Sequence, residues 1–212
     1  MKFSPGRFNG LIANIAQQVA WWKTDRCPCR DPYSGGPTQG CPSCGGRGWV
    51  WTAQTAGTLF LSGMKVQSQW ATFGLYQTGD VSVTLPSNSS VYALKDMDRV
   101  RFTDSSAGIN QTFTHGVDDA VLPFQLTSID RAFALNSSQL PQDFTIPTIN
   151  SDQTLSWASD QEPAAGQQYT LTGRARPEYF VAYSSVEQDR AHHRGFALPR
   201  RIILRRFDLF GR

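Results

Sequence analysis

The sequence predicts a mainly β protein, a barrel or sandwich of short antiparallel strands with one N-terminal helix. Three observations indicate this fold. From residue 55 onward, short runs rich in Val, Ile, Thr, Phe and Tyr alternate with clusters of Gly, Pro, Asn, Asp and Ser. A helical apolar pattern stands out only near the N-terminus. With 212 residues, of which 40% are hydrophobic and 17% charged, the chain is long and apolar enough to bury a core and unlike a disordered protein.

The helix is expected over residues 7–23, where apolar side chains recur at helical spacing and polar side chains lie opposite. The recurring apolar residues are Phe8, Leu11, Ile12, Ile15, Val19 and Trp22. Such a stripe packs on a domain core or, alternatively, docks on another subunit. Polar residues interrupt the segment, and it is shorter than the roughly 20 apolar residues of a membrane helix. We therefore expect neither a membrane span nor a secretory signal here.

Strands are expected near 57–66, 80–85, 91–94, 98–103, 111–115, 122–130, 167–173, 178–183 and 200–207. The alternation is clearest over residues 80–85, where Val81, Val83 and Leu85 share one face. Residues 136–166 contain several prolines and polar stretches, and we expect a long irregular excursion there.

Two regions are expected along the chain. Residues 1–54 would contain the N-terminal helix and a loop closed by cysteines. Residues 55–212 would form the β-barrel or sandwich domain, including the excursion near 136–166.

All four cysteines lie within residues 27–44, as Cys27-x-Cys29, eleven intervening residues, and Cys41-x-x-Cys44. Two closely spaced pairs supply the four soft ligands that a zinc ion takes at tetrahedral corners. No His or Glu lies beside the pairs, so we expect a structural zinc site with no open position. The metal would stabilise a loop that has no core of its own.

Gly45, Gly46 and Gly48 follow the second cysteine pair, and such small residues let backbone amides approach the sulfurs. Residues 41–48 resemble the Cys-x-x-Cys-x-Gly-x-Gly zinc motif of J-domain co-chaperones, which implies zinc binding and no chaperone function. Two disulfides in an oxidising compartment, or an iron–sulfur cluster, are the alternatives for these cysteines.

The loop also carries basic and aromatic residues that could contact nucleic acid, as zinc knuckles do in some proteins. These residues are Arg26, Arg30, Arg47, Trp49 and Trp51. The alternative is that the metal fixes the loop for contact with another protein.

Catalytic motifs are not evident, and we do not expect an enzyme. The histidines are His115, His192 and His193, and none is accompanied by a recognisable nucleophile or open metal site. The acidic pairs Asp96/Asp98 and Asp118/Asp119 are more typical of turns and solvated rims than of catalytic dyads.

Charge is distributed in blocks. The net charge is +5 over residues 1–75, −7 over 76–170 and +5 over 171–212. Such a pattern suits a molecule that meets unlike neighbours at its two ends, for example copies arranged head to tail in a ring. The basic residues expected at the subunit interface are Arg200, Arg201, Arg205 and Arg206. A solvated edge strand protected by its charges is the alternative for these arginines.

Two segments resemble small virion proteins of tailed bacteriophages, the head-closure or stopper-type connectors of the neck. They are residues 70–83, WATFGLYQTGDVSV, and residues 97–102, MDRVRF. In that family a barrel strand follows a Gly-Asp turn, here Gly79-Asp80, and a later Asp-x-Val-x-Phe strand lies on the barrel rim. Residues 169–173 and 198–201 and the cysteine loop also resemble phage virion proteins, so the resemblance spans roughly residues 20–207.

This resemblance implies a neck protein that forms a ring under the portal, continues the DNA channel and seats the tail. The partners would be portal or adaptor proteins, tail proteins and other copies of the chain, in a ring of about six or twelve. DNA would pass without specific binding, no membrane would be involved, and the protein would be assembled into virions in the host cytoplasm.

A channel that lets DNA slide carries few fixed cations, and acidic residues are expected to face it. They are Asp96, Asp98, Asp104, Asp118 and Asp119. A tail or baseplate protein is the alternative within the virion, and a zinc-dependent nucleic-acid-binding protein is the alternative outside it.

Overall fold

The computed structural model describes residues 4–62, 79–119, 122–159, 162–184, 192–193 and 195–209. The chain divides into two compact units, the first made of residues 1–104 and 178–212, the second of residues 105–177. The second unit is thus an insertion in the first. This division differs from the boundary predicted between residues 54 and 55, because strands on both sides of that boundary belong to one barrel. Residues 63–66 of an expected strand and residues 70–78 of the phage-like segment lie outside the described residues.

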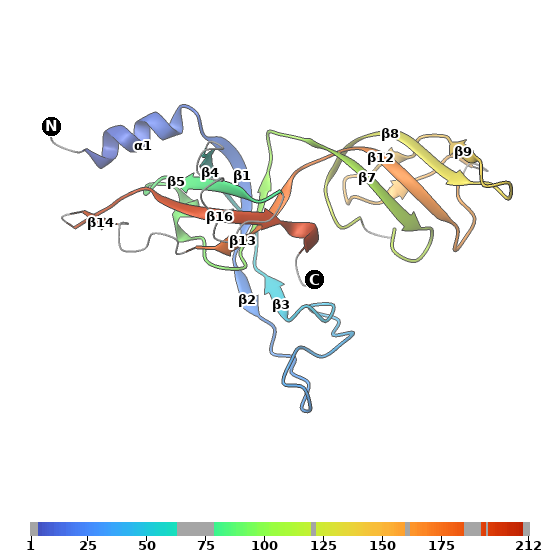
Figure 1. Cartoon of the computed structure of the whole chain (residues 1–212), viewed down its shortest axis with the longest axis horizontal. Helices are drawn as coiled ribbons and strands as arrows, with labels where there is room; N and C mark the ends of the chain where they lie inside the picture. Colours follow the sequence, from blue (N-terminus) through green and yellow to red (C-terminus); the bar gives the residue numbers. More distant parts are fainter. Residues whose placement is uncertain are drawn as a thin grey trace. The chain divides into compact units, whose positions relative to one another are not determined.

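Six antiparallel strands of the first unit close into a barrel in the order β1, β4, β5, β16, β13, β6 (Figure 1). Their bounds are β1 Gln17–Trp22, β4 Thr55–Leu61, β5 Val81–Leu85, β6 Arg99–Phe102, β13 Glu178–Tyr183 and β16 Arg200–Arg206. β5 begins directly after Gly79 and Asp80, and it pairs with β16 so that Val83 lies opposite Ile202. The predicted mainly β fold is confirmed, and its first unit is a barrel.

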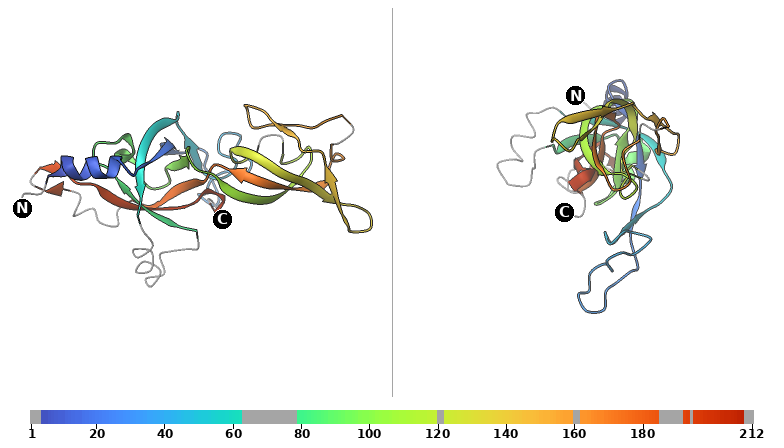
Figure 2. Two further views of the ribbon diagram at one scale, coloured as in Figure 1. Left: turned by 90° about the horizontal axis from the view of Figure 1, so that it is seen from above. Right: turned by 90° about the vertical axis from the view of Figure 1, so that its right-hand side faces the viewer.

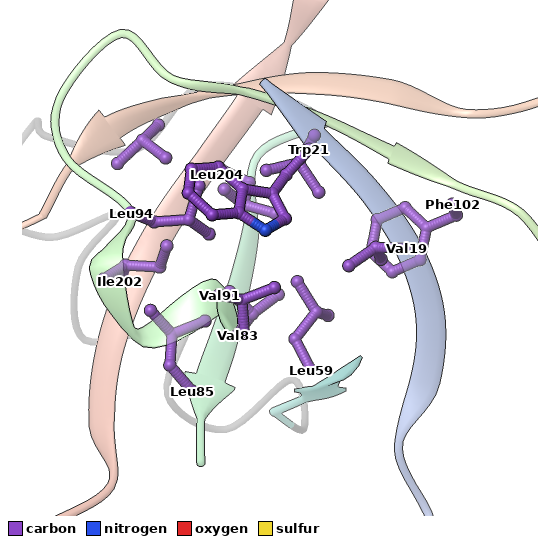
Figure 3. Close-up of a cluster of buried hydrophobic side chains, with 12 residues drawn as sticks. Val19, Trp21, Leu59, Val83, Leu85, Val91, Leu94, Phe102, Ile202 and Leu204 are labelled. Atoms are coloured by element: carbon purple, nitrogen blue, oxygen red, sulfur yellow. The ribbon is translucent and has the colours of Figure 1, made fainter. Parts of the chain in front are cut away.

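Apolar side chains from all six strands fill the barrel interior (Figure 3). The core consists of Val19, Trp21, Leu59, Val83, Leu85, Val91, Leu94, Val100, Phe102, Val181, Ile202 and Leu204. Burial alternates clearly along β6, whereas β1 and β16 each bury three consecutive residues. The interior is therefore a packed core, and a channel for DNA through the barrel of a single copy is excluded.

The predicted helix over residues 7–23 is wrong in its second half. α1 spans Pro5–Ala13, and the chain forms strand β1 from Gln17 onward. β1 hydrogen-bonds to β4 on one side and to β6 on the other, so barrel closure outweighs the helical pattern of its side chains. Val19 and Trp21 enter the core from alternate positions, a spacing of two that the longer helical pattern concealed.

Residues 91–94 do not form the predicted strand. Residues 91–93 belong to a 3₁₀ turn, η1 Ser90–Ala93, and Val91 and the following Leu94 lie in the barrel core. The turn packs closely on β4 at Gly57, where an added Cβ would lie 2.5 Å from Cγ1 of Val91. Gly57 therefore permits the close approach of η1 to the barrel wall.

The second unit contains a four-stranded sheet in the order β7, β12, β8, β9, and a separate pair, β10 and β11. Their bounds are β7 Ala107–Thr114, β8 Leu126–Leu135, β9 Pro141–Phe144, β10 Thr148–Ile149, β11 Leu155–Ser156 and β12 Gln168–Ala175. The expected excursion over 136–166 thus contains three short strands. The core of this unit is Phe113, Leu122, Leu126, Ala132, Ala134, Tyr169, Leu171 and Ala175.

The remaining elements are β2 Thr24–Arg26, β3 Trp49–Trp51, β14 His192–His193, β15 Phe196–Ala197 and the 3₁₀ turn η3 Phe207–Leu209. β14 and β15 pair as a short hairpin before β16. Within the described parts of the chain, no helix has the length and apolar character needed to cross a bilayer.

Candidate metal centre

The four cysteines lie on a loop that projects from the barrel on a two-stranded stalk (Figure 1; Figure 2, right-hand view). The stalk pairs β2 with β3, and the Cys27 N–H extends this pairing by donating to the Gly48 carbonyl at 2.8 Å. Beyond the stalk, Cys44 is the only buried residue between positions 27 and 48. The loop therefore has no hydrophobic core to hold its conformation.

The four sulfur atoms of Cys27, Cys29, Cys41 and Cys44 all lie within 4.8 Å of one another. Two of the separations are 3.9 Å, between Cys27 and Cys41, and 3.4 Å, between Cys29 and Cys44. A tetrahedral ion with metal–sulfur bonds of about 2.3 Å requires sulfur separations of about 3.8 Å. All four cysteines are free, so the cluster is a four-thiol site that can hold a metal ion.

Backbone hydrogen bonds shape the second cysteine pair into a tight turn. Gly45 N–H donates to the Cys41 carbonyl at 2.7 Å, and Arg47 N–H donates to the Cys44 carbonyl at 3.1 Å. Gly48 N–H points at the Cys44 sulfur, 3.3 Å away. Gly45, Gly46 and Gly48 have positive φ angles, so they fit this turn without the strain that a side chain would add.

Ionisation is unequal among the clustered thiols. Hydrogen bonds from the backbone N–H groups of Cys44 and Ser43 lower the pKa of Cys41 to about 6. A hydrogen bond with Cys27 is the main cause that raises the pKa of Cys29 to about 12, with burial and the other thiols contributing. Four thiolates so close together would repel one another, so they need a cation to be charged at the same time.

The root of the stalk is anchored to the barrel by Asp98. The Thr24 N–H donates to the Asp98 carboxylate at 2.7 Å, and the Thr24 hydroxyl donates to the Met97 carbonyl at 2.6 Å. The same carboxylate accepts the Lys95 N–H at 2.8 Å. Asp98 is buried, and burial raises its pKa. Its role is therefore to fix the start of the stalk.

A second anchor is a cluster of charged and aromatic side chains around Glu178. The guanidinium groups of Arg99 and Arg101 both donate to the Glu178 carboxylate, which is almost completely buried. The centre of the Trp22 ring lies 5.0 Å from the guanidinium carbon of Arg99 and 4.9 Å from that of Arg101. The ring of Trp51, on the stalk, is centred 5.8 Å from the guanidinium carbon of Arg99. Sequence reasoning missed this cluster because its members come from four different strands.

Three of the four arginines of the predicted subunit interface form bonds within the chain. Arg205 forms an ion pair with buried Asp80 at 2.9 Å. Arg200 donates to the backbone carbonyls of Tyr92 and Leu94 inside the first unit. Arg206 is exposed and pairs with Asp208 at 2.6 Å. Arg200 and Arg205 therefore form bonds within the first unit, and the contact of the four arginines with another subunit stays a prediction.

The predicted acidic channel residues are divided between the two units. Asp96, Asp98 and Asp104 belong to the first unit, and Asp118 and Asp119 belong to the second. Asp98 and Asp119 are buried and hydrogen-bonded, so neither can face a channel. The other three are accessible and accept backbone N–H groups, from Ser184 to Asp96, from Gln18 to Asp104 and from Thr114 to Asp118.

The basic and aromatic residues proposed to contact nucleic acid are divided between two environments. Arg26 stacks on Trp49 within the stalk, 4.9 Å from the ring centre. The Trp51 ring packs edge-on against the Phe207 ring after β16, with 5.5 Å between the ring centres. Arg30 and Arg47 are exposed on the loop. The loop therefore presents two free cations but no continuous basic and aromatic surface.

His115 is the one histidine whose side chain lies within the described residues. Its Nδ1 lies 2.8 Å from the Asp119 carboxylate, which also accepts the Tyr169 hydroxyl at 2.8 Å. This network fixes the turn after β7. His192 and His193 form β14.

In comparisons with known proteins, no protein-family model and no curated protein matches the chain.

Proposed function

We propose that the four cysteines bind one zinc ion with a structural role. The observation that carries this proposal is the clustering of four sulfurs on a loop without a hydrophobic core. Four thiolates complete a tetrahedral zinc site and leave no position for water or substrate. A single ion also accounts for the short sulfur separations, whereas a cluster of several metal atoms would hold its cysteines farther apart.

The metal is tested by elemental analysis of protein purified without chelator, together with its absorption spectrum. We expect about one equivalent of zinc per chain and no visible absorption. Iron with visible charge-transfer bands would support an iron–sulfur centre instead. Less than about half an equivalent of any metal, with all thiols reactive toward a titrant, would contradict the metal site.

We further propose that the protein is a structural component of a tailed-phage virion, assembled as a ring in the neck between portal and tail. The support for this proposal is the sequence resemblance of residues 70–83 and 97–102 to head-closure proteins, together with the closed barrel that contains the strand after Gly79-Asp80.

The packed core of the barrel limits where a DNA channel could lie. Because side chains fill the interior of the barrel, a DNA channel would have to lie between copies and not within one copy. The head-closure resemblance implies this arrangement, with DNA passing through the ring without specific binding. Portal or adaptor proteins and tail proteins would contact the two faces of the ring.

Electron microscopy and sedimentation test this proposal. We expect the zinc-loaded protein to form rings with a central opening, and antibodies against it to label the neck of virions. Labelling at the tail tip would favour the tail or baseplate alternative. A monomer at every concentration and ionic strength, with no labelling of virions, would contradict a structural role in the virion.

A further inference from the structure

The apex of the cysteine loop is a rigid turn built around Asp31. Its carboxylate accepts the backbone N–H groups of Tyr33 at 2.9 Å and Ser34 at 2.7 Å. Its own N–H donates to the Gly36 carbonyl at 2.8 Å, and its carbonyl accepts the Gly35 N–H at 2.9 Å. These bonds order the apex before any partner binds, which lowers the entropy cost of binding.

This ordered apex presents an aromatic ring and a cation to solvent. Tyr33 is 97% exposed, the highest value among the large hydrophobic side chains of the described residues. The Arg30 guanidinium lies over the same turn, 3.4 Å from the position that a Cβ on Gly35 would take. Tyr and Arg are the residue types that most often dominate binding energy at protein interfaces.

The turn after β7 of the second unit presents an exposed apolar residue beside an exposed acidic one. Val117 is 72% exposed, and Asp118 beside it is also exposed. Of the eight exposed large hydrophobic residues in the described parts of the chain, Val117 alone has an acidic residue as its immediate neighbour. The turn is ordered as well, because Thr114 N–H donates to the Asp118 carboxylate and Gly116 N–H donates to Asp119 at 2.7 Å.

The charges of the two units are opposite and favour contact between copies. The first unit contains seventeen Lys and Arg against ten Asp and Glu, a net charge of +7. The second contains three Lys and Arg against seven Asp and Glu, a net charge of −4. Electrostatic attraction would steer the first unit of one copy toward the second unit of another.

We propose that the Arg30–Tyr33 apex of one copy docks on the Val117–Asp118 turn of the next copy. The Tyr33 ring would cover Val117, and the Arg30 guanidinium would pair with the Asp118 carboxylate. The two surfaces are different, so the contact is heterologous and repeats from copy to copy until a ring closes. This inference rests on the proposed ring and assigns the metal loop its role in that ring.

Sedimentation velocity of the full zinc-loaded chain tests the contact. We expect Tyr33→Ala and Val117→Ser each to weaken self-association at least about tenfold. Tyr33→Phe should retain association, and so should Phe196→Ala, which truncates another exposed aromatic side chain outside the proposed contact. Zinc content and circular dichroism identify any variant that has lost its fold.

Mixing the two defective variants gives the decisive result. In a head-to-tail contact, the Tyr33→Ala protein keeps an intact turn and the Val117→Ser protein keeps an intact apex. An equimolar mixture should therefore form dimers that do not extend into larger assemblies. No dimers in the mixture, or unchanged association of Tyr33→Ala, would overturn this contact and leave the ring proposal standing. A wild-type monomer at all concentrations and salt conditions would overturn the ring itself.

Discussion

The Asp80 carboxylate is completely buried and receives the Arg205 guanidinium through Nε at 3.1 Å and Nη2 at 2.9 Å. Asp80 precedes β5, and Arg205 lies near the end of β16, so the pair joins neighbouring strands of the barrel. The hydrogen bond to Asp80 raises the pKa of Arg205. Two residues far apart in sequence thus neutralise each other beside the paired strands β5 and β16.

Replacing Arg205 with Ala is expected to lower the free energy of unfolding by roughly 3–5 kcal/mol, because the buried Asp80 carboxylate would lose its ion pair with the guanidinium group. Arg206→Ala is the matched control, since it removes an exposed pair with Asp208 and should cost less than about 1 kcal/mol. Urea denaturation followed by circular dichroism measures both. Equal effects of the two substitutions would show that the Asp80 pair does not stabilise the barrel.

Gly57→Ala is expected to destabilise the first unit by about 1–3 kcal/mol, because the new methyl group would overlap Val91. Val91→Ala in the same chain should recover part of this loss by making room. Gly108→Ala is the control, because a Cβ there meets nothing within 4 Å. Thermal unfolding of the three variants tests the close approach of η1 to β4. Equal stability of Gly57→Ala and wild type would contradict it.

Cys41→Ser is expected to abolish zinc binding and unfold the loop over residues 25–50, because one tetrahedral ligand is lost. The β-sheet circular dichroism should be largely unchanged, since the barrel core contains no residue of the loop between positions 27 and 48. Trypsin should then cleave rapidly after Arg30 and Arg47. Ser43→Ala in the same loop is the control and should stay resistant. Retention of zinc and protease resistance by Cys41→Ser would count against the four-cysteine site.

Acid sensitivity of the second unit should depend on Asp119. Burial opposes its ionisation, but hydrogen bonds from His115, Tyr169 and Gly116 outweigh burial and lower its pKa. Such a carboxyl stabilises the folded state above its unfolded pKa of about 3.9, and the stability is lost as pH falls through the lowered folded pKa.

Asp119→Asn should therefore cost about 1–3 kcal/mol at pH 7 and flatten the loss of stability below about pH 4. Urea denaturation at several pH values measures this dependence. Exposed Asp130→Asn is the control and should leave both quantities nearly unchanged. An identical pH profile for Asp119→Asn and wild type would disprove the role of this network.

Isolated protein is expected to bind DNA weakly and without sequence preference, and Arg47→Ala should leave this binding almost unchanged. A protein that lines a DNA channel must let the DNA slide, so we expect it to make few cationic contacts with phosphates. A DNA-binding protein makes many such contacts and releases counterions for each of them. Fluorescence anisotropy across a salt series measures the affinity and its salt slope. Tight binding with a steep slope that Arg30→Ala or Arg47→Ala reduces would favour the zinc-dependent nucleic-acid-binding alternative.

Local sequence was sufficient to predict the features that depend on nearby residues. The four cysteines lie within residues 27–44, so their spacing indicated a common site, which the structure brings together. β13 spans Glu178–Tyr183, the same residues that were predicted, and β5 differs from its prediction only by starting at Val81. Strands with clear alternation and flanking turn residues are recognisable because both signals are local.

Tertiary structure alone decided the features that depend on distant partners. Gln17–Trp22 became a strand because β4 and β6 offered hydrogen bonds on both sides, which no helical pattern in the segment could reveal. The insertion of residues 105–177, and the burial of Asp80, Asp98 and Asp119, likewise follow from contacts between residues far apart in the chain. Composition and spacing determined that the protein would be rich in strands and carry a four-cysteine site. Folding of the barrel and of the second unit determined which carboxylates became buried, because burying a charged group requires a specific partner that only the folded chain supplies.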